Sequence, residues 1–227
     1  MPSQPTASKR MLTQLVDLSH TISNGLKTYP GMPSPEIEPH MDHEASRGRY
    51  EAGTVFHIAR VSMVGNTGTY LDVPFHRFPD GADLAAIPLE RLAALPCTVV
   101  RVPGVAVIDE ESFGGVDVEG RAVLVHTGWS DRWGTDAYFD PHPHLTRGAA
   151  ELLVRAGAVL VGIDAVNVDD TSGGARPVHS TLLGGGVLVV EHLSGLDAVP
   201  ADGALFYAVP LKLAGVGSFS VRAFARF

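Results

Sequence analysis

The 227-residue sequence has a single cysteine, Cys97, which excludes an intrachain disulfide. Scarce cysteine is typical of proteins from reducing compartments, so we expect a cytoplasmic protein. The first ten residues contain Lys9 and Arg10 but no apolar segment behind them. We therefore predict a flexible tail over residues 1–10 rather than a secretory signal.

Positive charge is also scarce. Seventeen Lys and Arg residues stand against 25 Asp and Glu, which gives a net charge of −8 with His neutral. This balance argues against nucleic acid or an anionic membrane as the main partner. No apolar run approaches the roughly 18 residues that a membrane-spanning helix needs. A small molecule is the expected partner.

The amino-acid composition is typical of one globular domain. The hydrophobic share is 45% and the charged share 19%, values typical of a chain with a substantial core. The 25 glycines and 16 prolines are spread between short segments, with no repeat or linker. We predict a single domain over residues 11–227.

Strands are the dominant predicted element. Runs rich in β-branched residues and bounded by Gly, Pro or Asp predict strands at 98–102, 122–126, 158–163, 186–191 and 204–209, with a less regular candidate at 55–64. Thr146 and Gly157 bracket the best helix, and Pro88 and Pro96 bracket a second over 88–95. The pattern indicates an α/β domain with more sheet than a doubly wound fold.

Several common motifs are missing. The segment GWSDRWG has Arg132 where the second glycine of G-x-S-x-G belongs, and no dinucleotide or phosphate-binding glycine loop occurs. The acidic stretch 167–174 lacks calcium-loop spacing and is predicted to be a plain loop. Cys97, at the start of a predicted strand, is interpreted as a buried structural thiol.

Carboxylates and imidazoles gather instead at predicted strand ends. If residues 66–72 are extended, Asn66, Tyr70 and Asp72 share one face. Pro74 then stops sheet pairing and turns His76 back towards Asp72.

Further along the chain, His179 precedes a predicted short turn or helix, and Glu191 and Asp164 each close an apolar strand. Burying such a carboxylate is costly unless it is paired, protonated or metal-bound. The alternative interpretation is that these carboxylates lie at strand ends where they contact solvent.

These segments resemble the signature of the Putative cyclase family, whose members include bacterial kynurenine formamidases and isatin hydrolases. The family pattern H-x-x-x-H-x-D-x-P-x-H reads N-T-G-T-Y-L-D-V-P-F-H here, followed by His179 and Glu191. Four other segments resemble parts of the family sequence and occur in the same order: LVDLSHTI, YPGMP, VHTGW and FYAVPLKLAGVGSFSVRAFA. The resemblance implies a swivelling β/β/α fold and a homodimer or homotetramer.

The resemblance also implies a site. Carried onto this chain, Asp72, His179 and Glu191 are metal ligands and His76 is a proton carrier. The two remaining motif histidines are replaced by Asn66 and Tyr70, which are poorer zinc donors than imidazole. The remaining ligand set suits one divalent ion, Zn or Mn, although a site without metal is also compatible with it.

Two interpretations of Tyr70 and Asn66 are open. In one, their side chains bind a substrate carbonyl or oxyanion; in the other, they only fill the space of the missing histidines. Among the other histidines, His142 and His144 are the first candidates to compensate for the lost donors or to lie around the substrate, with ordinary solvated or hydrogen-bonded histidines as the favoured alternative. Trp129 is either an aromatic substrate wall or core packing.

The expected function is hydrolysis of a small amide, cyclic amide or lactone, resembling that of kynurenine formamidase, with one metal ion activating a water molecule. One alternative is a metal-independent cyclase or dehydratase that acts on a secondary metabolite and uses His76 and Tyr70 as acid and base. The other is a non-catalytic protein that binds a small molecule.

Overall fold

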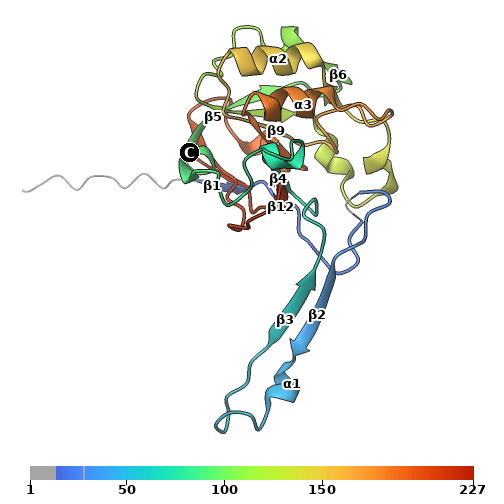
Figure 1. The fold of residues 1–227 in the computed structure, drawn as a ribbon, viewed down its shortest axis with the longest axis vertical. Coiled ribbons are helices and arrows are strands. Elements are labelled where there is room, and N and C mark those ends of the chain that lie inside the picture. The colour runs from blue at the N-terminus through green and yellow to red at the C-terminus, as the bar shows by residue number, and fades with distance from the viewer. Residues whose placement is uncertain (1–13, 28) are drawn as a thin grey trace, which may run out of the picture.

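A computed structural model describes residues 14–27 and 29–227, so the tail predicted over residues 1–10 lies outside the described residues. The body of the molecule is built on one curved sheet (Figure 1). Its nine strands, in spatial order, are β1 (Leu15–Asp17), β13 (Phe224–Arg226), β11 (Ala204–Tyr207), β5 (Leu95–Arg101), β7 (Ala122–His126), β9 (Leu160–Ile163), β10 (Leu188–Glu191), β4 (Tyr70–Asp72) and β12 (Ser218–Ser220). The predicted sheet-rich α/β class is confirmed.

The centre of this sheet is parallel. Strands β5, β7, β9 and β10 pair in parallel, and antiparallel strands extend the sheet on both sides. Parallel strands are covered on both faces, which explains why their sequences are continuous apolar runs. All four residues of β9 are buried.

Each face of the sheet carries its own core. Helices α2 (Arg147–Arg155) and α3 (Pro177–Gly184) cover one face, where Leu153 and Leu182 pack with Val123. The concave face encloses the second core, which includes Leu124 and Phe206. This arrangement leaves the polar ends of β4 and β10 beside the start of α3.

The best predicted helix is confirmed. The Thr146 hydroxyl accepts a hydrogen bond from the backbone N–H of Ala149, and Gly157 follows α2 with a φ of +80°. The helix predicted over 88–95 is wrong. Only the 3-10 turn η2 (Leu89–Arg91) forms, and Pro96 and Cys97 lie inside β5, because Leu95 and Cys97 bury their side chains in the core.

A two-stranded arm projects from the body (Figure 1). Its strands are β2 (Glu36–Met41) and β3 (Ile58–Ser62), and the short helix α1 (His43–Ser46) lies at its tip. The prediction at 55–64 contains β3. Two short strands, β6 (Val107–Ile108) and β8 (His144–Leu145), pair elsewhere in parallel. Over residues 14–27 and 29–227, no helix is both long and apolar enough to cross a membrane.

Candidate active site

Strand register assembles the centre of the candidate site. In the antiparallel pairs around β4, Tyr70 lies opposite Glu191 on β10, and Asp72 lies opposite Ser218 on β12. Directly opposed residues of an antiparallel pair place their side chains on the same face. Three separate parts of the sequence therefore meet at one end of the sheet.

Asn66 reaches this place by a turn rather than by strand alternation. The strand begins only at Tyr70, and Gly68 has a φ of +66°, so the expected extended run over 66–72 is wrong in its first half. The Asn66 side chain lines the same cavity as Tyr70. The Ile22 side chain packs directly against this turn, and a Cβ on Gly68 would lie 2.8 Å from it.

His179 lies inside α3, not before it as predicted, and its ring is held on both sides. Its Nδ1 lies 2.7 Å from Asp169 Oδ2, and its Nε2 lies 3.5 Å from both Asp72 Oδ2 and Glu191 Oε1. Burial disfavours the imidazolium, but Glu191, Asp169 and Asp72 outweigh that effect and raise the pKa of His179.

Asp169 is a site residue that the sequence interpretation missed. Its carboxylate also accepts backbone N–H groups of Val178, at 2.7 Å, and of His179, at 3.0 Å. It therefore fixes the first turn of α3 together with the His179 ring. The stretch 167–174, predicted to be a plain loop, supplies this carboxylate. Two adjacent acidic residues, Asp169 and Asp170, in the loop between β9 and α3 were the available signal.

Glu191 is fully buried and accepts three hydrogen bonds. The donors are the Tyr70 hydroxyl, the Asn167 amide at 3.3 Å and the backbone N–H of Val168 at 2.7 Å. Burial raises the pKa of Glu191 to about 7, and the nearby His179 opposes that rise. Burial also raises the pKa of Tyr70 well above its ordinary range, so Tyr70 is a neutral phenol that donates to Glu191.

His76 ends the 3-10 turn η1 (Pro74–His76), with Nδ1 2.7 Å from Ser218 Oγ. Ser218 donates its own proton to Asp72, so its oxygen is left to accept from His76. This arrangement places the imidazole proton on Nδ1 and leaves Nε2 as a base. Gly217 makes the close approach possible, because a Cβ there would lie 2.4 Å from the His76 backbone nitrogen.

Tyr70, His76, His179 and Glu191 border one cavity of about 260 Å³. Its lining comes from the segment that leads into the arm, the turn before β4, η1, the loop after β9, α3 and β10: Tyr29, Met32, Asn66, Tyr70, His76, Arg77, Asn167, Arg176, His179 and Glu191. Acidic and imidazole groups form one part of this lining, and two arginines form another.

The donor set fits one divalent metal ion. Asp72 Oδ2 is buried without a hydrogen-bond partner. It lies 3.5 Å from His179 Nε2, close to the roughly 3.4 Å that separates two tetrahedral ligands of zinc. Ligand atoms of Asp72, His76 and His179 all lie within 4.8 Å of one another. Either Glu191, as expected, or His76 completes a set with Asp72 and His179.

Other predicted site residues lie elsewhere. Asp164 accepts hydrogen bonds from the backbone of Thr127 and Gly128, so it shapes a loop rather than the cavity. Trp129 lines a separate cavity of about 260 Å³. His142 bonds Thr171 through Nε2, at 3.0 Å, and His144 bonds the His142 carbonyl. Neither histidine lines the cavity beside Asp72, so the structure agrees with the alternative of ordinary hydrogen-bonded histidines.

Comparison with known proteins gives a consistent result. A family model described as Putative cyclase matches residues 16–170. The kynurenine formamidase of Bacillus cereus is 26% identical over 215 residues, which cover 94% of this chain and 98% of that protein. Isatin hydrolase A from Labrenzia aggregata, solved with benzyl benzoate bound, is 25% identical with a TM-score of 0.77, covering 94% of this chain and 93% of that one. A potential metal-dependent hydrolase with cyclase activity is 27% identical, also with a TM-score of 0.77, covering 94% and 98%.

Proposed function

This chain belongs to the Putative cyclase family, and on that premise we propose that it is a hydrolase that cleaves the carbon–nitrogen bond of a small amide with the help of one divalent metal ion. The names of two relatives describe hydrolysis of a formamide and of isatin, a cyclic amide. Both are carbonyl compounds with a nitrogen leaving group.

One observation carries the proposal. The His179 ring is fixed by Asp169, so that Nε2 points at two buried carboxylates, one of which has an oxygen without a hydrogen-bond partner. A histidine oriented through Nδ1 by a carboxylate is the usual arrangement of a metal-ligating imidazole. Asp72, His179 and Glu191 would hold the ion, which when bound would polarise the carbonyl and acidify a water molecule.

The remaining steps belong to side chains of this chain. His76 Nε2, left unprotonated by the Ser218 contact, takes a proton from the attacking water and returns it to the leaving nitrogen. Asn66, at the cavity wall, offers an amide N–H to the substrate carbonyl. Tyr70 keeps Glu191 oriented instead of acting as the acid, because its proton is already given to that carboxylate.

The first experiment measures metal content and hydrolysis together. Protein purified without chelators is analysed by inductively coupled plasma mass spectrometry, and hydrolysis of formanilide is followed by release of the amine. We expect about one ion per chain, lost in Asp72→Asn, and turnover that chelation abolishes and Zn²⁺ or Mn²⁺ restores. His76→Ala is expected to keep the ion and lose at least about a hundredfold in turnover.

Other outcomes would contradict the proposal. Turnover that persists after chelation, with no bound ion, would favour the metal-independent cyclase or dehydratase. Neither metal nor turnover, with a ligand still bound in the cavity, would favour a binding protein. Fractionation of the native cells with an antibody tests the cytoplasmic location that the proposal assumes.

A further inference from the structure

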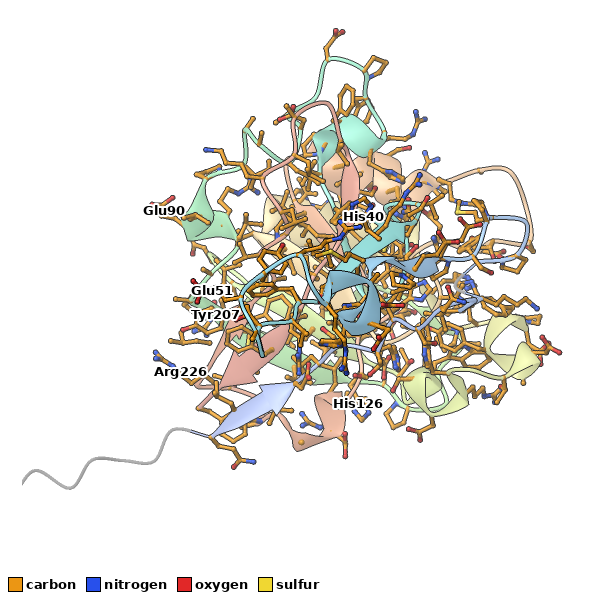
Figure 2. All side chains as sticks on the ribbon, turned by 90° about the horizontal axis from the view of Figure 1, so that it is seen from below. His40, Glu51, Glu90, His126, Tyr207 and Arg226 are labelled. Carbon is orange, nitrogen blue, oxygen red and sulfur yellow. The ribbon has the colours of Figure 1, made fainter. Side chains whose placement is uncertain are left out.

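The cavity lined by Trp129 and Arg132 has no part in the proposed function. Its volume is about 260 Å³, equal to that of the candidate active site, and the two share no lining residue. It lies at the carboxyl ends of β5 and β7, the edge of a parallel sheet where ligands bind in α/β proteins. Figure 2 shows His126, which ends β7, near the pale yellow-green turns η4 (Trp129–Arg132) and η5 (Asp136–Phe139). The cavity is therefore a separate candidate for a ligand site.

A buried carboxylate fixes one wall of this cavity. Asp164 accepts hydrogen bonds from the Thr127 backbone at 2.8 Å, the Thr127 hydroxyl at 2.6 Å and the Gly128 backbone at 2.9 Å. Thr127 and Gly128 both line the cavity, and Thr127 is buried. Burying a carboxylate is costly unless donors stabilise it, and all three donors of Asp164 belong to the cavity wall. Asp164 therefore holds this turn in one conformation.

Trp129 forms a fixed flat wall. Its Nε1–H donates to the Tyr138 carbonyl at 2.8 Å, and its backbone N–H donates to the Thr127 hydroxyl at 3.2 Å. The Arg132 guanidinium lies over the indole, with Cζ 3.9 Å from the ring centroid. The cation–π attraction holds the guanidinium on the ring, which reduces the entropy lost when Arg132 binds a ligand.

Arg132 has no acidic partner in the part of the chain that the structure describes, residues 14–27 and 29–227. Its guanidinium forms no salt bridge there, although the chain has 25 acidic residues against 17 basic ones. Stacking uses the face of a guanidinium and leaves the N–H groups at its edge, which bind carboxylates in pairs. A single cation matches the one charge of a carboxylate better than a phosphate group, which carries up to two.

The rest of the wall is largely apolar. Val105 and Ala106 line the cavity from the loop after β5, and Pro141 and Pro143 line it from the segment before β8. Pockets for drug-sized ligands have volumes of roughly 300–1,000 Å³ and are lined mostly by such side chains. A cavity of about 260 Å³ therefore suits a ligand with one ring rather than several.

We propose that this cavity is a second ligand site, separate from the candidate active site, for a small aromatic carboxylate. The carboxylate pairs with Arg132, and the ring lies against Trp129 and the two prolines. The site does not rest on the proposed hydrolase function, because it uses none of the residues of that function. It gives Trp129 the role of an aromatic wall, at a cavity other than the one expected.

Trp129 makes the site observable by fluorescence. The chain has two tryptophans, so Trp133→Phe leaves Trp129 as the only indole, and no tryptophan lines the candidate active site. Benzoate should change the fluorescence of this protein saturably. Benzamide, which is neutral and has nearly the same shape, should bind at least about tenfold more weakly. Absence of a response to benzoate, or equal affinity for the two compounds, would overturn the proposal.

Two further substitutions in the Trp133→Phe protein test the two parts of the site. Arg132→Gln removes the charge and should weaken benzoate binding by about ten- to a hundredfold. Ala106→Phe narrows the cavity, keeps Arg132 and should abolish the response. Arg77→Gln is the matched control, because Arg77 lines the candidate active site, and benzoate affinity should stay unchanged. Unchanged affinity in Arg132→Gln or in Ala106→Phe would overturn the proposal.

Isothermal titration gives the same comparison without Trp133→Phe, in case that variant does not fold. Benzoate is titrated into wild-type protein, Arg132→Gln and Arg77→Gln. Binding heat that Arg132→Gln loses and Arg77→Gln keeps supports the second site, whether or not any amide is hydrolysed. Binding heat that depends on Arg77 and not on Arg132 would place benzoate in the candidate active site and overturn the proposal, as would no heat in wild-type protein.

Discussion

Replacing Asp169 by asparagine tests how the His179 ring is oriented. The carboxylate accepts three N–H groups, from the His179 ring, the His179 backbone and the Val178 backbone. An amide has a single acceptor oxygen, so Asp169→Asn must turn its NH₂ group towards one of these donors. If the amide donates to His179 Nδ1, the imidazole proton moves to Nε2, which then cannot bind a metal ion.

The size of the effect follows from this change of tautomer. Loss of the partner that orients a metal-ligating histidine lowers metal affinity by about ten- to a hundredfold, or about 1.4–2.7 kcal/mol. Turnover at limiting metal should fall in parallel. The fold should persist, because Asp169→Asn keeps the volume of the buried side chain.

The assay is a competition titration of Mn²⁺ or Zn²⁺ against a chelating indicator. Asp170→Asn is the matched control, because Asp170 is exposed and accepts hydrogen bonds from Ser172, on the far side of the turn from His179. Equal metal affinity in Asp169→Asn and in wild-type protein would refute the reasoning.

Three further predictions concern single groups. Tyr70→Phe leaves buried Glu191 with one donor fewer, and the free energy of unfolding in urea should fall by about 1–3 kcal/mol. Burial raises the pKa of the Cys97 thiol from 9.0 to about 11, so iodoacetamide at pH 8 should not modify the folded protein. The free energy of unfolding should decline as the pH rises above about 9, because the Cys97 thiol of the unfolded chain loses its proton at a lower pH than that of the folded chain. Gly217→Ala should displace His76 and lower turnover at least about tenfold, with metal content retained.

Each of these predictions has its own control. Tyr207→Phe removes a hydroxyl from a half-buried tyrosine that stacks on Phe224, and a loss of stability equal to that in Tyr70→Phe would contradict the role given to the Tyr70 hydroxyl. Gly173→Ala adds a methyl group with no atom within 4 Å, and equal turnover in both alanine variants would disprove the His76 contact. Modification of Cys97 at the same rate with and without urea would contradict its burial.

Much of the fold was predictable because local patterns and tertiary packing agree. The strands at 122–126 and 158–163 are continuous apolar runs, and the structure buries them at the parallel centre of the sheet. The helix after Thr146 has both a cap and a glycine stop. The error at 88–95 arose where packing overrode local propensity, because Leu95 and Cys97 join the core as strand residues.

The site was predictable where one short segment carries it and unpredictable where distant segments meet. Tyr70, Asp72 and His76 lie within one turn-and-strand segment, so their proximity follows from spacing. Asp169 and Ser218 are brought in by the start of α3 and by the register of β12, which no spacing along the chain encodes. The sequence alone does not distinguish the buried Asp169 from the exposed Asp170 beside it.

The Tyr70 and Glu191 pair explains how the sheet end tolerates the loss of an imidazole. A carboxylate without a metal ion or a donor is costly at full burial. Tyr70 lies opposite Glu191 in the strand register and supplies a donor at the position from which a motif histidine is missing. The Tyr70 hydroxyl and the Asn167 amide donate to Oε2, whereas Oε1, which faces His179, accepts only the Val168 N–H. The substitution therefore keeps Glu191 hydrogen-bonded on both oxygens, and it leaves Oε1 as the Glu191 oxygen that would bind the single ion of the proposed function.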